Sequence, residues 1–247
     1  MIVLFNDIVP DNVVSADNTN PNYPIGNIKD PFLRKRWQST ETSDTVTIEL
    51  STATDINLIA IGYTNAETIT LVFYGFDTLG YDSDTIGYDG DSIALNSADA
   101  GSPIDIGSCS WVGSSTISKA EITFDAVSSV VYVGKISMGL GTVLPSPEST
   151  WEESFDDMSI ISVSQSGQVL QERVDPLRRW SFNFPTLNRD GTRSLQEDYI
   201  STGAGKPIFV YPGTDDLPLL YCRLEQPITT NKNLRRYNSN LVLVEAR

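Results

Sequence analysis

Side chains that carry acid–base chemistry are unevenly represented in this sequence. It contains no histidine but 32 Asp and Glu residues. Without an imidazole, Ser-His-Asp and Cys-His nucleophilic systems, the commonest general base and most catalytic zinc sites are excluded. The remaining route is a pair of facing carboxylates, as in a polysaccharide-degrading enzyme. Four carboxylates instead lie in a polar stretch typical of a solvated face: Glu152, Glu153, Asp156 and Asp157. We therefore predict that the chain is not an enzyme and uses no cofactor.

A long segment rich in Gly, Asp and Ser runs from Gly75 to Gly107. Its Asp-x-Asp spacing could supply the oxygen ligands that calcium takes from a single loop. The four candidate ligands are Asp82, Asp84, Asp89 and Asp91. The residue order of a twelve-residue EF-hand is absent and no Glu closes the loop. We therefore interpret the segment as a solvated acidic loop and keep a metal site as the alternative.

Aromatic residues in and near this segment could form a platform for a carbohydrate, because sugars stack on exposed rings. The residues are Tyr74, Phe76, Tyr81 and Tyr88. Tyr and Phe are also ordinary strand residues, so the same pattern fits a sheet. Tyr81 and Tyr88 are the candidate glycan contacts.

The most distinct basic features of the second half of the chain are two pairs of adjacent arginines, Arg178-Arg179 and Arg235-Arg236. Each pair precedes or enters an expected strand. Charges at a sheet edge prevent unwanted strand pairing. The same charges can form salt bridges to an acidic neighbouring subunit. Both interpretations stay open, and the second makes these four arginines candidates for an oligomer interface.

The formal net charge of −15 is unequally distributed. Residues 1–145 hold 18 acidic and 6 basic residues, a net of −12, and the remainder hold 14 and 11, a net of −3. An acidic surface repels phosphates, so we expect neither nucleic acid nor a membrane as a partner. No apolar run approaches the roughly 20 residues that span a bilayer. Residues 1–5 lack the features of a signal peptide, so we expect a soluble chain.

Most of the first half is expected to form short β-strands. Thr45–Leu50 alternates apolar and polar residues with the period of a half-buried strand. Further strands are expected at Ile56–Tyr63, Thr68–Tyr74, Lys119–Phe124 and Val130–Met138. Cys109 and Cys222 both lie in strand-like runs, where free cysteines usually pack as small hydrophobes.

A domain boundary is expected near Leu144–Thr150, which has the composition of a linker. One helix is expected over Thr192–Ser201, where Leu195 and Tyr199 have helical spacing. The strands expected beyond the linker are Ser159–Ser164, Val169–Gln171, Arg178–Phe184, Pro207–Tyr211, Leu219–Leu224 and Asn240–Glu245. The sequence therefore predicts a mainly β chain of two sandwiches, residues 6–144 and 151–247, with one helix in the second.

The segment Asn18–Ser39 and the strands after it resemble the opening of galactose-binding-like (discoidin-like) jelly rolls of bacteriophage tail and prophage proteins. The matching elements are Tyr23-Pro24, Asn27-Ile28-Lys29-Asp30 and Trp37-Gln38-Ser39. The resemblance covers residues 6–144 and implies an N-terminal jelly-roll β-sandwich. It makes Trp37 a core residue rather than a ligand contact.

The segment Arg178–Arg247 resembles the tail-tube-like β-sandwich of siphophage distal tail and minor tail proteins. In this chain an Arg-Arg-Trp-x-Phe-x-Phe strand precedes a helix, a Gly-Lys-Pro-Ile-Phe-Val segment, a Leu-Tyr-Cys-Arg strand and a closing Leu-Val-Leu-Val-Glu, and the resemblance lies in this order of elements. In that family such domains stack as rings around the tail lumen. The usual distal tail plan puts the tube-like domain first. Here the order is reversed, unless residues 1–5 pair with the C-terminal sheet and make the jelly roll an insertion.

Together these resemblances imply a structural protein of a bacteriophage tail tip or baseplate, carried in the virion and assembled in the host cytoplasm. Its expected partners are its own copies in a ring and the tail tube, hub and tape measure proteins. The strands expected to carry the ring contacts are Arg178–Phe184, Pro207–Tyr211 and Asn240–Glu245. The alternative function is a carbohydrate-binding module that attaches to a host surface glycan.

Overall fold

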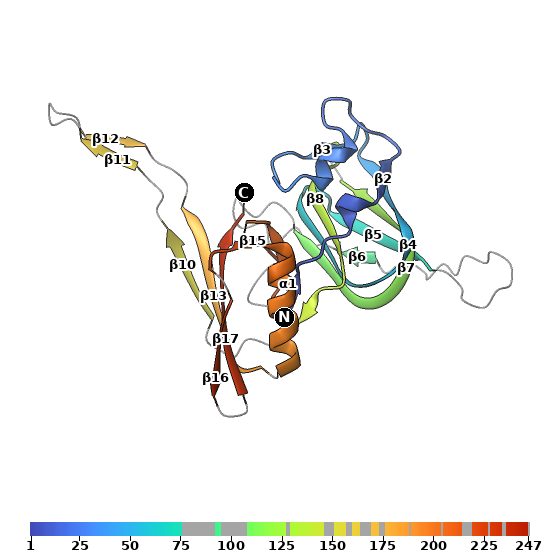
Figure 1. Cartoon of the computed structure of the whole chain (residues 1–247). Coiled ribbons are helices and arrows are strands. Elements are labelled where there is room, and N and C mark those ends of the chain that lie inside the picture. Colours follow the sequence, from blue (N-terminus) through green and yellow to red (C-terminus); the bar gives the residue numbers. More distant parts are fainter. Residues whose placement is uncertain are drawn as a thin grey trace.

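The structure, a computed structural model, describes residues 1–75, 92–94, 108–126, 129–145, 151–156, 160–163, 169–172, 176–187, 189–203, 205–213, 219–226, 228–233 and 236–246. These residues form two large antiparallel sheets, a separate two-stranded sheet and a single α-helix (Figure 1). The predicted mainly β fold with one helix is therefore confirmed. None of the helices in these ranges is long and apolar enough to cross a membrane.

The first sheet has seven strands in the order β3-β8-β4-β7-β5-β6, with β2 paired to β4. Figure 1 shows β4 and β7 curving through this part of the molecule. Two short 3-10 helices accompany the sheet, η1 (Val9–Asp11) and η2 (Ile25–Lys29). The strands are β2 (Val13–Ala16), β3 (Trp37–Gln38), β4 (Ser43–Thr64), β5 (Thr68–Tyr74), β6 (Ser92–Ala94), β7 (Cys109–Asp125) and β8 (Tyr132–Gly139).

The strands predicted at Thr45–Leu50 and Ile56–Tyr63 are in fact one strand of 22 residues, β4. It pairs with β7 along most of its length, and the register shifts twice between Glu49 and Leu58. Such bulges bend a strand without ending it. The prediction of two strands was wrong because the polar segment 51–55 has the composition of a turn.

The first core includes buried apolar residues of the paired strands β4 and β7. Val46, Ile48, Ile122 and Phe124 are all fully buried there. Trp37 is also fully buried, and its ring lies 6.3 Å from the ring of Phe124. Trp37 is therefore a core residue, as predicted.

The second sheet runs in the order β10-β13-β17-β15-β14-β1-β9, with β16 also paired to β17. Figure 1 shows the helix α1 (Arg189–Thr202) lying against it. Its apolar residues Leu195 and Tyr199 join the second core. The strands are β1 (Ile2–Leu4), β9 (Thr142–Val143), β10 (Trp151–Asp156), β13 (Leu177–Leu187), β14 (Ile208–Tyr211), β15 (Leu220–Leu224), β16 (Thr229–Asn233) and β17 (Arg236–Glu245).

Both cysteines are free and buried, as predicted. Burial raises the pKa of the Cys109 thiol to about 12, and it also raises the pKa of the Cys222 thiol. Both side chains are therefore uncharged apolar packing groups at neutral pH.

A hairpin projects from the second sheet. Its strands, β11 (Ile160–Val163) and β12 (Val169–Glu172), pair with each other in a separate two-stranded sheet. In Figure 1 this hairpin continues beyond β10 and β13 and lies far from the body of the molecule. The strands expected at Ser159–Ser164 and Val169–Gln171 are thus present and pair with each other.

The strand β1 joins the two sheets because both of its faces are buried. Val3 packs into the second core, whereas Ile2 and Leu4 pack with Leu58 of β4 and Phe209 of β14. β1 pairs with β14 on one side and with β9 on the other. One N-terminal strand therefore lies between strands from later parts of the chain.

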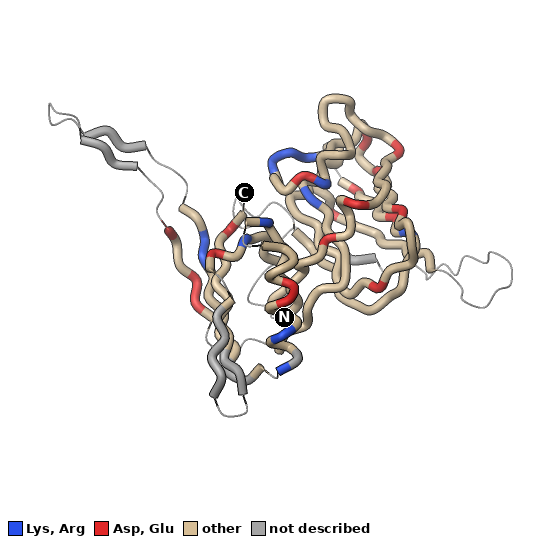
Figure 2. Tube along the Cα trace, in the orientation of Figure 1, with Lys and Arg blue, Asp and Glu red and all other residues tan. Residues whose placement is uncertain are grey.

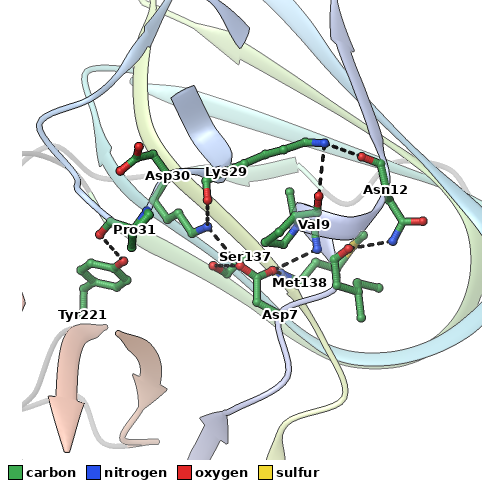
Figure 3. A network of polar contacts seen from close by, with 12 residues as sticks. Asp7, Val9, Asn12, Lys29, Asp30, Pro31, Ser137, Met138 and Tyr221 are labelled. Carbon is green, nitrogen blue, oxygen red and sulfur yellow. Dashed lines mark hydrogen bonds and ion pairs between the residues drawn. The ribbon is translucent and has the colours of Figure 1, made fainter. Parts of the chain in front are cut away.

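A buried polar network holds the segment that follows β1 (Figure 3). The carboxylate of Asp7 pairs with Lys135 Nζ at 3.2 Å. It also accepts hydrogen bonds from Ser137 Oγ and from the backbone N–H groups of Val9 and Met138. Burying a charge is costly unless it is paired and hydrogen-bonded, and this carboxylate is both.

A second polar contact crosses between the sheets. The Tyr221 hydroxyl of β15 donates to the carbonyl oxygen of Pro31 at 2.6 Å (Figure 3). Burial, with a smaller contribution from the charge of Asp7, raises the pKa of Tyr221. The phenol therefore stays protonated and remains a donor at neutral pH.

We expect Asp7→Asn to lower the free energy of unfolding by about 3 kcal/mol, because it leaves the buried Lys135 ammonium without its counter-charge. Urea denaturation followed by fluorescence measures this change. The matched control is Lys35→Gln, which breaks the exposed pair with Asp30 and should cost less than about 1 kcal/mol. Equal losses in the two variants would contradict the assignment.

Candidate functional site

Three tyrosines and one arginine form a connected cluster on the first sheet. The guanidinium carbon of Arg36 lies 4.5 Å from the ring centroid of Tyr132 and 5.5 Å from that of Tyr23. The ring of Tyr132 lies 5.6 Å from that of Tyr63. Tyr23 is 38% exposed and the other three side chains are half-buried. We call these four residues the tyrosine–arginine cluster.

Tyr63 has an unusual backbone conformation. Its φ of +61° is the only positive φ at a non-glycine residue in the described ranges. A bulky residue in this left-handed region is strained, typically by 1–3 kcal/mol, and such strain is concentrated at functional sites. Gly134 on β8 makes room for it, because a Cβ on that glycine would lie 2.8 Å from Tyr63 Cβ.

Hydrogen bonds to the backbone hold the other cluster residues in place. Asn65 Oδ1 accepts from the N–H of Tyr132, while Asn65 Nδ2 donates to the carbonyl of Val130. Asn27 Nδ2 donates to the carbonyl of Arg36 at 2.9 Å. The carbonyl of Tyr23 accepts from the N–H of a β3 residue at 3.2 Å. The side chains are thus presented by an anchored backbone before any ligand arrives.

The electrostatics of the cluster are set by Arg36. Within the described ranges no carboxylate oxygen lies within 4.0 Å of its guanidinium, although the chain holds 32 acidic residues. Burial is the main cause that raises the pKa of Tyr132, and the Arg36 charge opposes it. The Tyr132 phenol is therefore protonated at neutral pH and can donate a hydrogen bond.

The chemistry that this arrangement can perform is binding. Aromatic faces stack on the apolar faces of sugar rings, and phenol and guanidinium groups donate hydrogen bonds to hydroxyl or acidic oxygens. The cluster itself contains no thiol, carboxylate or imidazole that could act as nucleophile or general base. Among the residues that the structure places, no group of acidic or cysteine side chains has the geometry of a metal site.

The predicted sites on the long loop lie outside the described residues. These are the candidate metal ligands Asp82, Asp84, Asp89 and Asp91 and the candidate glycan contacts Tyr81 and Tyr88. Phe76 lies outside as well. Tyr74 is described on β5, where its hydroxyl donates to Glu121 at 2.7 Å and the Lys119 ammonium lies over its ring. The loop sites stay predictions.

The predicted interface arginines are only partly described. Arg178 and Arg179 lie on β13, and Arg179 pairs with Asp156 and Glu225 of its own chain. Arg235 lies outside the described residues, and only the backbone of Arg236 is described. The register places Arg179 opposite Val244, at the other end of β17 from Arg236. Their role at an oligomer interface stays a prediction.

The tyrosine–arginine cluster was not predicted from the sequence. The signal that could have located it is Arg34-Lys35-Arg36, a basic run in a half of the chain with a net charge of −12. Figure 2 shows this basic run on the loop that precedes β3. No similar signal in the sequence identifies Tyr63 or Tyr132, because only the pairing of their strands brings them close to Arg36.

An exposed apolar edge lies on the second sheet. The register places Trp151 opposite Phe182, which is buried in the second core, and Phe155 opposite Arg178. Alternate residues of a strand share a face, so Phe155 lies on the core face of the sheet. It is nevertheless 62% exposed. The polar stretch interpreted as a solvated face is thus an edge strand, β10, with one large apolar side chain uncovered.

Known proteins were compared with the chain. No family model matches it, and no curated protein matches it. It is similar to a solved chitosan-binding module of a chitosanase/glucanase from Paenibacillus, with 9% identity over 54% of this chain and 98% of the module, at a TM-score of 0.41.

Two further solved structures are also similar. A family 32 carbohydrate-binding module of Clostridium perfringens in complex with galactose shares 11% identity over 53% of this chain and 96% of the module, at a TM-score of 0.41. A GH29 fucosidase of Ruminococcus gnavus in complex with fucose shares 12% identity over 57% of this chain and 28% of the enzyme, at a TM-score of 0.45. The resemblance to phage tail proteins stays a prediction.

We expect Gly134→Ala to destabilise the first sheet by about 1–3 kcal/mol, because the added methyl would lie 2.6 Å from the Leu33 carbonyl oxygen and 2.8 Å from Tyr63 Cβ. Urea denaturation measures the loss, and near-ultraviolet circular dichroism reports the tyrosine environment. The control is Gly26→Ala, where nothing lies within 4 Å of the added Cβ. A Gly134→Ala protein as stable as the control would show that Tyr63 is not held by this contact.

Proposed function

We propose that this chain is a non-catalytic binding protein whose tyrosine–arginine cluster binds a glycan. The observation that carries the proposal is Arg36, held against the rings of Tyr23 and Tyr132 without a carboxylate partner in the described ranges. An arginine that serves only packing is usually paired when half-buried, because desolvating an unpaired charge costs free energy. Here a ligand would supply the missing hydrogen-bond acceptors.

The strain at Tyr63 supports the same proposal. The fold maintains a φ of +61° at a bulky residue, although a glycine or an asparagine would be less costly there. A tyrosine at this position places its ring beside that of Tyr132. The strain is thus accounted for by the aromatic surface that it creates.

We expect Tyr23→Ala to weaken glycan binding about fivefold or more, because one stacking contact contributes roughly 1 kcal/mol. A glycan array identifies the ligand, and isothermal titration then gives the dissociation constants. The control is Phe32→Ala, which removes an aromatic ring that is 56% exposed and lies outside the cluster. Equal losses in both variants, or no glycan bound by the wild type, would contradict the proposal.

The second candidate function is assembly with further copies of this chain, as a structural subunit of a phage tail tip that would join tail tube, hub and tape measure proteins. The observation that favours it is the uncovered edge of the second sheet. Phe155 is exposed on the core face of β10, and the hairpin beyond it pairs only with itself in the described ranges. An isolated two-stranded hairpin is marginally stable in water, so a neighbouring subunit would stabilise it.

The opposite edge of the same sheet also carries exposed apolar residues. Val143 on β9 is 66% exposed and Ile200 on α1 is 78% exposed. A hydrogen bond from Thr142 to Asp198 holds these two elements together. Complementary patches at opposite edges generate head-to-tail contacts, which close into rings when the rotation allows it. The acidic exposed residues of β10 are visible in Figure 2.

We expect the Phe155→Ser variant to form a particle of lower mass than the wild-type chain does. The variant lacks the largest apolar side chain that is exposed on that edge. Size-exclusion chromatography with light scattering over a range of protein concentrations measures the mass. Phe32→Ser is the control, since it removes a ring that is similarly exposed, 56% against 62% for Phe155, from the loop between η2 and β3. A wild-type chain that is monomeric at every concentration, alone and with tail proteins, would rule out this second function.

A further inference from the structure

The cations of the segment around the cluster differ in their surroundings. Lys35 pairs with Asp30 at 2.8 Å, and Lys29 donates to the backbone carbonyls of Pro10 and Asn12. Arg34 is exposed. Only Arg36 combines partial burial with a guanidinium that rests on aromatic rings.

The acidic residues on the neighbouring segments do not compensate Arg36. The carboxylate of Asp30 is engaged by Lys35. Glu41 is exposed, and its backbone carbonyl accepts from the N–H of Val131, yet its carboxylate makes no ion pair within 4.0 Å among the residues that the structure places. What distinguishes Arg36 is its half-buried guanidinium, which lies against two aromatic rings with no carboxylate partner among the described residues.

We infer that the ligand of the tyrosine–arginine cluster is an acidic sugar whose oxyanion binds the guanidinium of Arg36. The inference rests on the proposed glycan binding and adds the chemical class of the glycan. A guanidinium is a planar fork of N–H donors that matches a carboxylate, sulfate or phosphate with two parallel hydrogen bonds.

The remaining groups of the cluster fit the same ligand. The guanidinium carbon of Arg36 lies 4.5 Å from the ring centroid of Tyr132, and no carboxylate of the described residues pairs with the guanidinium, so its N–H groups can serve an oxyanion. The phenols of Tyr23, Tyr63 and Tyr132 add hydroxyl donors and ring faces. A cluster of donors around one cation favours an acceptor with negative charge over a neutral sugar. The acidic surface elsewhere on this half keeps the attraction local, since it repels anions.

Matched sugar pairs test the inference on the full chain. Glucuronic acid is compared with glucose and galacturonic acid with galactose, and glucose 6-sulfate distinguishes a sulfate from a carboxylate. Nuclear magnetic resonance titration at low and high salt measures each dissociation constant. We expect the acidic member of at least one pair to bind roughly tenfold more tightly, with a preference that shrinks as salt rises.

Two variants separate the role of Arg36 from the general charge of the segment. Arg36→Gln should remove the preference for the acidic sugar, and Arg36→Lys should retain part of it. Arg34→Gln removes the same charge two residues away and should leave the preference unchanged. Urea denaturation of each variant verifies that it is folded.

The possible outcomes distinguish a failure of this inference from a failure of the proposed glycan binding. Equal binding of acidic and neutral sugars, or a preference that survives Arg36→Gln in a folded protein, would overturn the inference while glycan binding stands. An array and titrations in which no sugar of either kind binds would overturn both.

Discussion

The fold depends on one strand that is buried on both faces. β1 contributes Val3 to the core of the second sheet and contributes Ile2 and Leu4 to the contact between the two sheets. A strand with no solvated face must be apolar at every position, and the run at Ile2–Leu4 is. Because Ile2 and Leu4 pack against Leu58 of β4, the two sheets cannot separate without exposing these apolar side chains. The Asp7 network and the bond from Tyr221 to Pro31 then fix the segments that leave this strand.

The tyrosine–arginine cluster belongs to the first sheet, while the uncovered edge at Phe155 belongs to the second. They lie on different parts of the molecule, so a glycan and a neighbouring subunit would not compete for one surface (Figure 1). Both proposed activities use preformed geometry rather than reacting groups. This agrees with a chain that lacks histidine, the side chain best suited to proton transfer near neutral pH.

Much of the fold could be predicted from the sequence, because strand and helix periodicities are local. The helix and the buried cysteines follow from residue type and spacing, whereas the burial of Trp37 was expected from the resemblance to galactose-binding-like jelly rolls. The strand β10 was missed because its exposed Glu152 and Glu153 resemble a solvated loop. Only pairing with β13 makes this segment a strand.

The candidate site could not be predicted, because it is built by long-range pairing. Tyr23, Arg36, Tyr63 and Tyr132 are far apart in the chain, and β8 brings them together by pairing with both β3 and β4. A tyrosine whose backbone has a positive φ cannot be recognised from a single sequence. Gly134, which leaves room for it, is a neighbour only once the strands are aligned.

The continuity of β4 has a mechanical consequence. Leu58 and Ala60 of this strand pack in the contact with the second sheet, and Tyr63 lies only three residues further along. A pull on a ligand held beside Tyr63 would travel along the strand axis, where the ladders to β7 and β8 resist it in shear, with many hydrogen bonds loaded at once. The force would therefore reach the second sheet through the few residues of β4 between Tyr63 and Ala60. A hydrogen-bonded strand transmits such a force with less extension than a flexible linker would.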